Sequence, residues 1–182
     1  VTMQLVHEGN KLYLLGKRKN ELGGSEYYHY KGHLGANIPK PQLAEVKKQL
    51  YAVIDAINEG LIVSAHDISE GGVATTLVEM ALGGRAEGEK GVSISLDEMS
   101  EDELMVYQLL FSETGGFVLE VPVEKEQDFV ALMKKYEYVD YVHIGEVTDQ
   151  KTIEIKHNNK AVVDISLDKA KKAWWEGLRE KL

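Results

Sequence analysis

The sequence of 182 residues contains no cysteine. This absence excludes disulfide bonds, thiolate nucleophiles and zinc sites with thiolate ligands. No apolar run is long enough to cross a membrane, and nothing at the start of the chain resembles a signal peptide. The formal net charge of −9 argues against a general nucleic-acid-binding protein, because such a protein needs a basic face. We therefore expect a cytoplasmic protein with neither nucleic acid nor membrane as a partner.

The most informative segment is an acidic, glycine-bearing stretch over residues 65–74, AHDISEGGVA. The apolar run Leu61–Val63 before it is typical of a buried strand. Apolar residues after it recur at helical spacing, namely Val73, Leu77, Met80 and Ala81. The stretch is therefore predicted to be a turn between a strand and a helix. The first N–H groups of such a helix can bind an anion, and Asp67 can bind a hard cation such as Mg²⁺.

Two interpretations of this turn remain open. In one, Ser69 or Asp67 caps the helix, and Gly71 and Gly72 only ease its packing against the sheet. In the other, the glycines let a ligand or another backbone approach closely. The turn is not a P-loop, because no Gly-Lys-Ser/Thr follows, and it lacks the third glycine of a Rossmann fingerprint.

The order of apolar patterns predicts an α/β fold with a mixed β-sheet and helices packed on it. At the N-terminal end, Met3–His7 and Leu12–Leu15 are predicted to form a hairpin or a pair of strands. A long helix is predicted from Pro39 and Pro41 to about Asn58, ended by Gly60. Its apolar stripe is expected to face the core and contains Leu43, Val46, Leu50, Val53, Ile54 and Ile57.

The second half of the chain alternates between strands and helices in the same way. Strands are predicted at residues 92–96, 117–121, 138–147, 152–156 and 161–165. Ser100 and Glu103 are predicted to form a capping box for a helix that runs through Leu110. Another helix is predicted over residues 124–136, with Phe129, Leu132 and Met133 directed inward. A terminal helix is predicted from Asp168, and we expect it to bury one of its adjacent tryptophans, Trp174 and Trp175.

A second polar segment joins the helix that ends near Leu110 to the strand that begins at Phe117. Its glycines can simply end the preceding helix as a C-cap. Alternatively, Ser112 and Glu113 face the same cleft as Asp67, and Glu113 accepts hydrogen bonds from a ligand hydroxyl or amine. We expect the side chains at these strand and helix ends to gather at one edge of the sheet, where ligands usually bind.

The histidines give weaker indications. His29 and His33 have the spacing of two metal ligands on a helix, but the glycines around them favour surface histidines. His66 and Asp67 are adjacent on an extended segment, so their side chains are expected to point in opposite directions. That arrangement argues against a catalytic His–Asp pair.

Three motifs together resemble a known family. Gly23–Glu26, Ser64–Gly72 and Phe111–Thr114 occur in the order in which they occur in PurL, the synthetase subunit of phosphoribosylformylglycinamidine synthase. The resemblance extends over essentially the whole chain. It implies the fold of an aminoimidazole ribonucleotide synthetase C-terminal domain. The abrupt start at Val1 is expected of a fragment, so residues 1–182 are expected to form a single C-terminal domain of a longer multidomain enzyme.

The resemblance also implies an activity for the full-length enzyme. Formylglycinamide ribonucleotide, ATP and glutamine-derived ammonia give formylglycinamidine ribonucleotide, ADP and phosphate, so ATP or ADP and Mg²⁺ are the expected cofactors. The implied partners are the nucleotide-binding domains of the same polypeptide and the glutaminase and small accessory subunits. Because the catalytic histidine and most ATP ligands lie on the nucleotide-binding domains, the fragment alone is expected to be inactive and to bind no cofactor.

The candidate ligand-binding residues are Asp67, Ser69, Gly71, Gly72, Ser112 and Glu113, and the resemblance supports Asp67 as the candidate Mg²⁺ ligand. Where a related domain of the family has Glu-Ser-Gln credited with substrate binding, this chain has Glu113-Thr114-Gly115. This departure favours a role in the family's second, non-turning-over nucleotide site, or in the fold alone. The alternatives are a sibling ATP-dependent enzyme (selenophosphate synthetase, thiamine-monophosphate kinase or a HypE-like protein) and a purely structural domain.

Overall fold

The computed structural model describes residues 1–84, 88–137 and 139–179. Its centre is one sheet of strands in the order β2-β4-β1-β5-β3-β6-β7. The strands are β1 (Lys11–Leu15), β2 (Ser64–Asp67), β3 (Gly91–Ser95), β4 (Phe117–Val121), β5 (Tyr141–Thr148), β6 (Thr152–His157) and β7 (Lys160–Ser166). Neighbours pair antiparallel except β3 with β6, which are parallel. The predicted mixed sheet is therefore confirmed.

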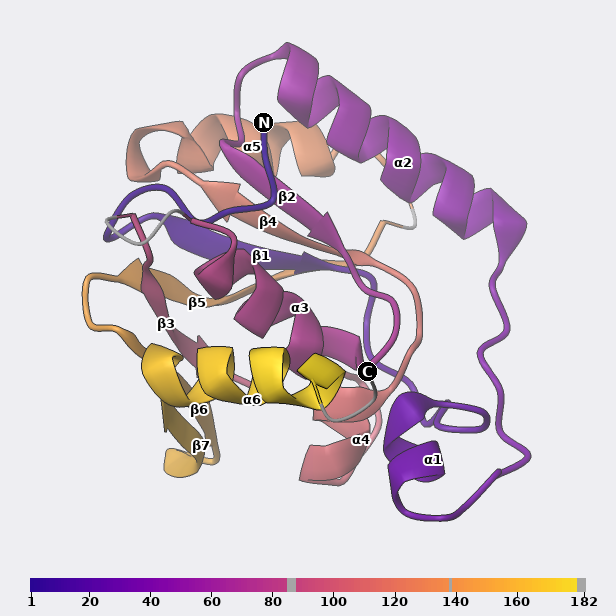
Figure 1. Ribbon diagram of the computed structural model, residues 1–182. Coiled ribbons are helices and arrows are strands. Elements are labelled where there is room, and N and C mark those ends of the chain that lie inside the picture. Colours follow the sequence, from indigo (N-terminus) through magenta and orange to yellow (C-terminus); the bar gives the residue numbers. More distant parts are fainter. Residues whose placement is uncertain (85–87, 138, 180–182) are drawn as a thin grey trace.

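Helices cover both faces of this sheet (Figure 1). They are α1 (Glu26–Tyr30), α2 (Leu43–Asn58), α3 (Gly72–Leu82), α4 (Val106–Phe111), α5 (Glu126–Met133, after a short 3₁₀ turn, Val123–Lys125) and α6 (Leu167–Arg179). Alternation along β1 separates two cores, because Leu12 and Leu14 pack with α3, α4 and α6 whereas Tyr13 and Leu15 pack with α2 and α5. No helix in the described ranges is long and apolar enough to cross a membrane.

Several predicted elements differ from the observed ones. Met3–His7 is not a strand and does not pair with β1, whose neighbours are β4 and β5. The strand expected at Leu61–Val63 begins at Ser64 and ends at Asp67. The capping box is also wrong: the Ser100 hydroxyl accepts the Asp102 N–H within a turn, and α4 begins only at Val106. Tyr138, with which a strand was expected to begin, lies outside the described residues.

The two amphipathic helices pack differently from the prediction. In α2 the buried residues are Ala52, Val53 and Ala56, whereas most of the expected stripe is exposed, as in Leu43 at 80%. The helix has two apolar faces, and sequence periodicity cannot tell which one meets the sheet. In α6 both tryptophans are exposed, at 52% and 65%. Leu167 and Ala170 are buried instead, whereas the tryptophans line a cavity together with the last turn of α3 and the bend after Leu82.

A buried carboxylate holds the N-terminal segment against the sheet. Glu120 of β4 is fully buried and accepts the backbone N–H groups of Val6 and His7 at 2.9 and 3.0 Å. The side-chain amide of Asn10 donates to it at 2.7 Å. Burial raises the pKa of Glu120 above its ordinary value, although these hydrogen bonds oppose the shift.

This raised pKa predicts a specific pH dependence of stability. The folded state keeps the Glu120 proton to higher pH than the unfolded state does, so this group's contribution to stability falls as the pH rises through the window above the ordinary glutamate pKa. Glu120→Gln should remove that component. Urea unfolding of both proteins across a pH series measures the difference in free energy of unfolding. A difference that stays constant across the window would contradict the prediction.

Candidate functional site

The polar segments singled out from the sequence meet at one edge of the sheet. Asp67 ends β2 and is paired with Phe117, which begins β4, while β1 ends beside the start of β5. A cavity of about 380 Å³ lies at this edge. Carboxylates (Glu21, Glu45, Asp67, Glu113 and Asp140) and lysines (Lys17, Lys19 and Lys40) line it together. Asp67 and Glu113 therefore share a cleft, as expected.

Glu113 is the point at which the three motifs connect. Its Oε1 atom accepts the backbone N–H of Gly71 at 2.9 Å and the backbone N–H of Glu26 at 2.9 Å. Glu26 begins α1, whose N-cap is Ser25. One carboxylate oxygen thus joins the turns 23–26, 69–72 and 111–114, which are far apart in the sequence. Its Oε1 atom is therefore engaged by backbone donors of its own chain, and hydrogen bonding of Glu113 to a ligand hydroxyl or amine stays a prediction.

Ser112 and Thr114 are also engaged within the chain. Ser112 is fully buried, and its hydroxyl lies 2.8 Å from that of Thr114. The Thr114 hydroxyl donates to the carboxylate of Glu21 at 2.8 Å. Ser112 does not line the cavity, and it acts as a connection between the turn at residues 112–116 and the segment that contains Glu21.

A buried arginine supports the same turn. The guanidinium of Arg18 donates to the carbonyl of Thr114, to that of Gly115 at 2.8 Å and to that of Gly16 at 3.1 Å. Its Nε atom is buried with no hydrogen-bond partner among the described residues. Burial lowers the pKa of Arg18 to about 10, against the opposing attraction of Glu21. Arg18 was not singled out in the sequence, because an arginine in a basic run (Lys17–Lys19) usually lies at the surface.

The two glycines differ in what they contact. Gly71 is the N-cap of α3 in the left-handed conformation, with a φ of 78°, and no side chain caps the helix, so the capping roles expected of Ser69 and Asp67 are wrong. Ser69 is exposed and does not line the cavity. Gly72 faces the end of α4: a Cβ atom there would lie 2.7 Å from the Leu110 carbonyl oxygen and 2.8 Å from that of Ser112. The close approach at Gly72 is therefore made by another backbone.

Asp67 is the sequence-derived residue that remains most available to a ligand. Its side chain is 65% exposed, and the Nδ1 atom of His66 lies 3.4 Å from its Oδ1 atom. The expectation that the two side chains diverge is therefore wrong, because the ring of His66 turns back toward Asp67 while its Nε2 atom meets Glu79 at 3.0 Å. Among the described residues, no three His, Cys, Asp or Glu side chains could hold a metal ion together. This result covers His29 and His33, too.

The cavity has a mixed lining, in which five carboxylates stand beside three lysines. Lys17, Lys19 and Lys40 line it and can neutralise an anion, although Lys17 also pairs with Glu101. Mg²⁺ in nucleotide sites is commonly held by one or two carboxylates together with phosphates and water. Asp67 can supply one such carboxylate. The sequence reasoning missed the lysines, and the run Lys17–Lys19 after a glycine was the pattern that would have indicated them.

Comparison with known proteins places this fold in a family. Residues 7–158 match the family model described as AIR synthase related protein, C-terminal domain. The chain belongs to this family.

Similar proteins within the family share one name. Subunit PurL of phosphoribosylformylglycinamidine synthase from Methanothrix thermoacetophila is 39% identical over the whole chain, which covers 23% of that protein. PurL from Thermoanaerobacter sp. is 37% identical over 95% of the chain and 22% of its own length. The chain therefore spans less than a quarter of the curated relatives that it matches, and the resemblance to PurL is confirmed.

Solved structures show the same fold. The structure of Thermotoga maritima PurL complexed with FGAR superposes with a TM-score of 0.79 at 18% identity, over 93% of this chain and 29% of that one. Hydrogenase maturation protein HypE superposes with a TM-score of 0.58 at 14% identity, over 88% of this chain and 54% of that one.

Proposed function

We propose that these 182 residues form a C-terminal domain of a phosphoribosylformylglycinamidine synthase, the ATP-dependent enzyme of purine biosynthesis that its PurL relatives are named for. The observation that carries the proposal is the identity of 39% over the whole chain, which includes the three connected motifs. A HypE-like sibling is the weaker candidate, because its structure superposes with the lower TM-score, 0.58 against 0.79.

In the proposed enzyme this domain contributes a wall of a nucleotide site. The reaction activates the amide oxygen of formylglycinamide ribonucleotide with ATP, and ammonia displaces the resulting leaving group. Solved PurL structures bind ATP, ADP and an ATP analogue, which supports nucleotide chemistry in the relatives. Here the lysines of the cavity would hold phosphate oxygens, and Asp67 would hold Mg²⁺, which neutralises phosphate charge when bound.

Within this assignment, Glu113 and Arg18 are positioning residues. Glu113 fixes the backbone of Gly71 and Glu26, and Arg18 fixes the carbonyls of residues 114 and 115. The departure at Thr114-Gly115 from the family's Glu-Ser-Gln supports the auxiliary nucleotide site rather than the substrate site.

The partners follow from the same assignment. A solved structure of PurLQS from Thermotoga maritima describes PurL together with other subunits. We infer that the longer enzyme that contains this domain joins nucleotide-binding domains of its own polypeptide, a glutaminase subunit and a small accessory subunit. Its place is the cytoplasm, where the metabolites of this reaction occur.

A domain exchange tests the proposal. The chain replaces the region of Methanothrix thermoacetophila PurL that it matches, and the purified chimera is assayed for formylglycinamidine ribonucleotide formation with ammonia as the nitrogen source. We expect activity, and we expect Asp67→Ala to lower retention of bound nucleotide while leaving the fold intact. A folded chimera that binds ATP and substrate but forms no product would overturn the proposal.

The isolated chain should not hydrolyse ATP. It has no phosphate-cradling loop with a lysine of the P-loop type. A phosphate-release assay on the purified chain should give the rate of buffer alone. Steady turnover that Asp67→Ala abolishes would show instead that this domain is catalytic by itself.

A further inference from the structure

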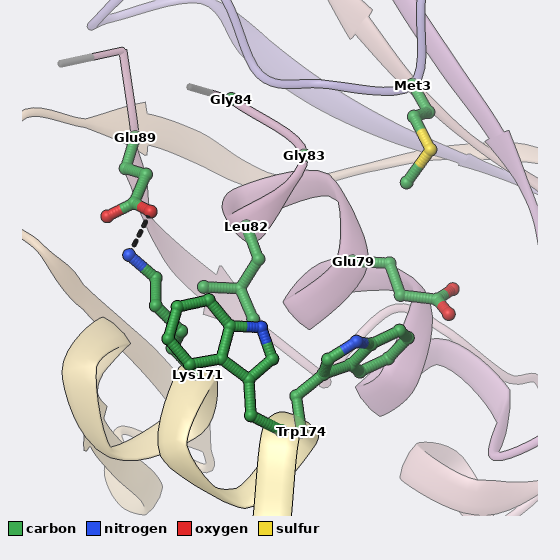
Figure 2. A pocket seen from close by; sticks show the side chains of 9 residues that line it. Met3, Glu79, Leu82, Gly83, Gly84, Glu89, Lys171 and Trp174 are labelled. Carbon is green, nitrogen blue, oxygen red and sulfur yellow. Dashed lines mark ion pairs between the residues drawn. The ribbon is translucent and has the colours of Figure 1, made fainter. Parts of the chain in front are cut away.

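A second cavity lies away from the Asp67 edge, at the other end of α3. Its volume is about 390 Å³, within the range of small-molecule sites. Met3, Leu82, Trp174 and Trp175 provide most of its apolar wall (Figure 2). Gly83 and Gly84 line it as well, together with Glu79 and Leu82 of the last turn of α3.

The two indole side chains are unusually exposed for large aromatic groups. They are its only tryptophans, and both are more than half exposed although they sit beside apolar Leu82 and Met3. Flat aromatic faces attract cations because the ring carries negative charge above and below its plane, and indole does so most strongly.

Three charged side chains, Glu79, Glu89 and Lys171, line the pocket beside the indoles. Lys171 forms an ion pair with Glu89, whose side chain is only 5% exposed, so these two charges cancel. Figure 2 shows this pair on one side of the indoles and Glu79 on the other. Glu79 contacts the imidazole of His66 through Oε2 at 3.0 Å, and its side chain is 24% exposed. The described lining therefore carries two carboxylates and one ammonium.

We propose that this cavity, named here the tryptophan pocket (Met3, Glu79, Leu82, Glu89, Lys171, Trp174 and Trp175), binds an organic monocation. A guanidinium or alkylammonium group lies against the indole faces and donates a hydrogen bond to Glu79. The proposal is independent of the purine-synthase assignment, because none of these residues lines the cavity at Asp67.

Fluorescence titration tests the proposal, because both tryptophans of the chain line the pocket. The 182-residue chain is titrated at low salt, because salt screens the attraction between exposed charges. Ethylguanidinium is the probe, and ethylurea is its neutral control of the same shape. We expect saturable quenching by ethylguanidinium with a Kd of about 1 mM, and no saturation by ethylurea.

A matched pair of variants locates the binding. Glu79→Gln should weaken ethylguanidinium binding about fivefold. Glu176→Gln removes the same charge from the helix that carries the tryptophans but lies outside the pocket, so it should leave the Kd unchanged. Equal responses to ethylguanidinium and ethylurea on the unmodified chain would overturn the proposal, and so would equal effects of the two variants.

A further arm distinguishes the source of the cation. A blocked Gly-Arg-Gly peptide carries the same guanidinium on a protein backbone. Tighter binding of the peptide than of ethylguanidinium identifies an arginine side chain as the ligand, whereas tighter binding of the free compound identifies a small metabolite. Failure of both compounds to bind overturns the proposal.

Discussion

Gly72→Ala should destabilise the folded chain by about 4 kcal/mol or more, or prevent folding. The new Cβ would meet the backbone of residues 110–112, with the Leu110 and Ser112 carbonyl oxygens at 2.7 and 2.8 Å and the Phe111 carbonyl carbon at 2.9 Å. Backbone atoms at the end of α4 cannot rotate away as a flexible side chain can. Gly72 also has a φ of 64°, which L residues rarely adopt.

Gly60→Ala is the matched control. Gly60 has a φ of 65°, almost the same conformation, but nothing lies within 4 Å of the Cβ atom that alanine would add. Its cost should therefore be only that of the left-handed conformation, about 1 kcal/mol. Chemical denaturation of both variants measures the difference in free energy of unfolding. Equal losses in the two variants would show that the contact between the start of α3 and the end of α4 is not tight.

Arg18→Met should cost about 3 kcal/mol or more in the free energy of unfolding. Methionine fills a similar volume but leaves the carbonyls of Gly16, Thr114 and Gly115 without their donors. The removal of a buried charge offsets part of this loss, since burial already lowers the pKa of Arg18. The damage should appear first in the turn at residues 112–116, because that is where two of the three carbonyls lie.

Lys19→Met provides the comparison, because Lys19 is exposed in the same basic run. Its effect on the free energy of unfolding should stay within about 0.5 kcal/mol. Hydrogen exchange of the amides in residues 112–116 should quicken in Arg18→Met and not in Lys19→Met. An Arg18→Met protein as stable as the unmodified chain would mean that the surrounding carbonyls find other donors.

The sequence predicted the arrangement of the fold well where patterns were local. Alternation at residues 117–121 and 152–156 identified β4 and β6, and the inward positions of α5 were correct at Phe129, Leu132 and Met133. Periodicity gave no information, however, about which segments pair with each other in the sheet. The N-terminal segment does not join β1 as a hairpin strand, because its amides are bound by the carboxylate of Glu120, which is more than 110 residues away in the sequence.

The sequence predicted where the candidate site lies, but not the contacts that its residues make. The ends of β2 and α4 were expected to gather at one sheet edge, and Asp67 and Glu113 do line one cavity there. The roles differ because they depend on distant contacts: Glu113 binds the backbone of Gly71 and Glu26, and Ser112 lies buried beside Thr114. Arg18, Lys17 and Lys19 were not singled out, because they lie in a segment whose pattern resembles any charged surface loop.

The ligand role of the cavity at Asp67 is the central claim, and a crystal structure of the active chimera with Mg²⁺ and a non-hydrolysable ATP analogue tests it most directly. We expect phosphate oxygens beside Lys17, Lys19 or Lys40, and a metal ion bound by Asp67, in the cavity that Glu113 also lines. A cavity filled instead by side chains of the rest of the polypeptide, with the nucleotide bound elsewhere, would contradict the account.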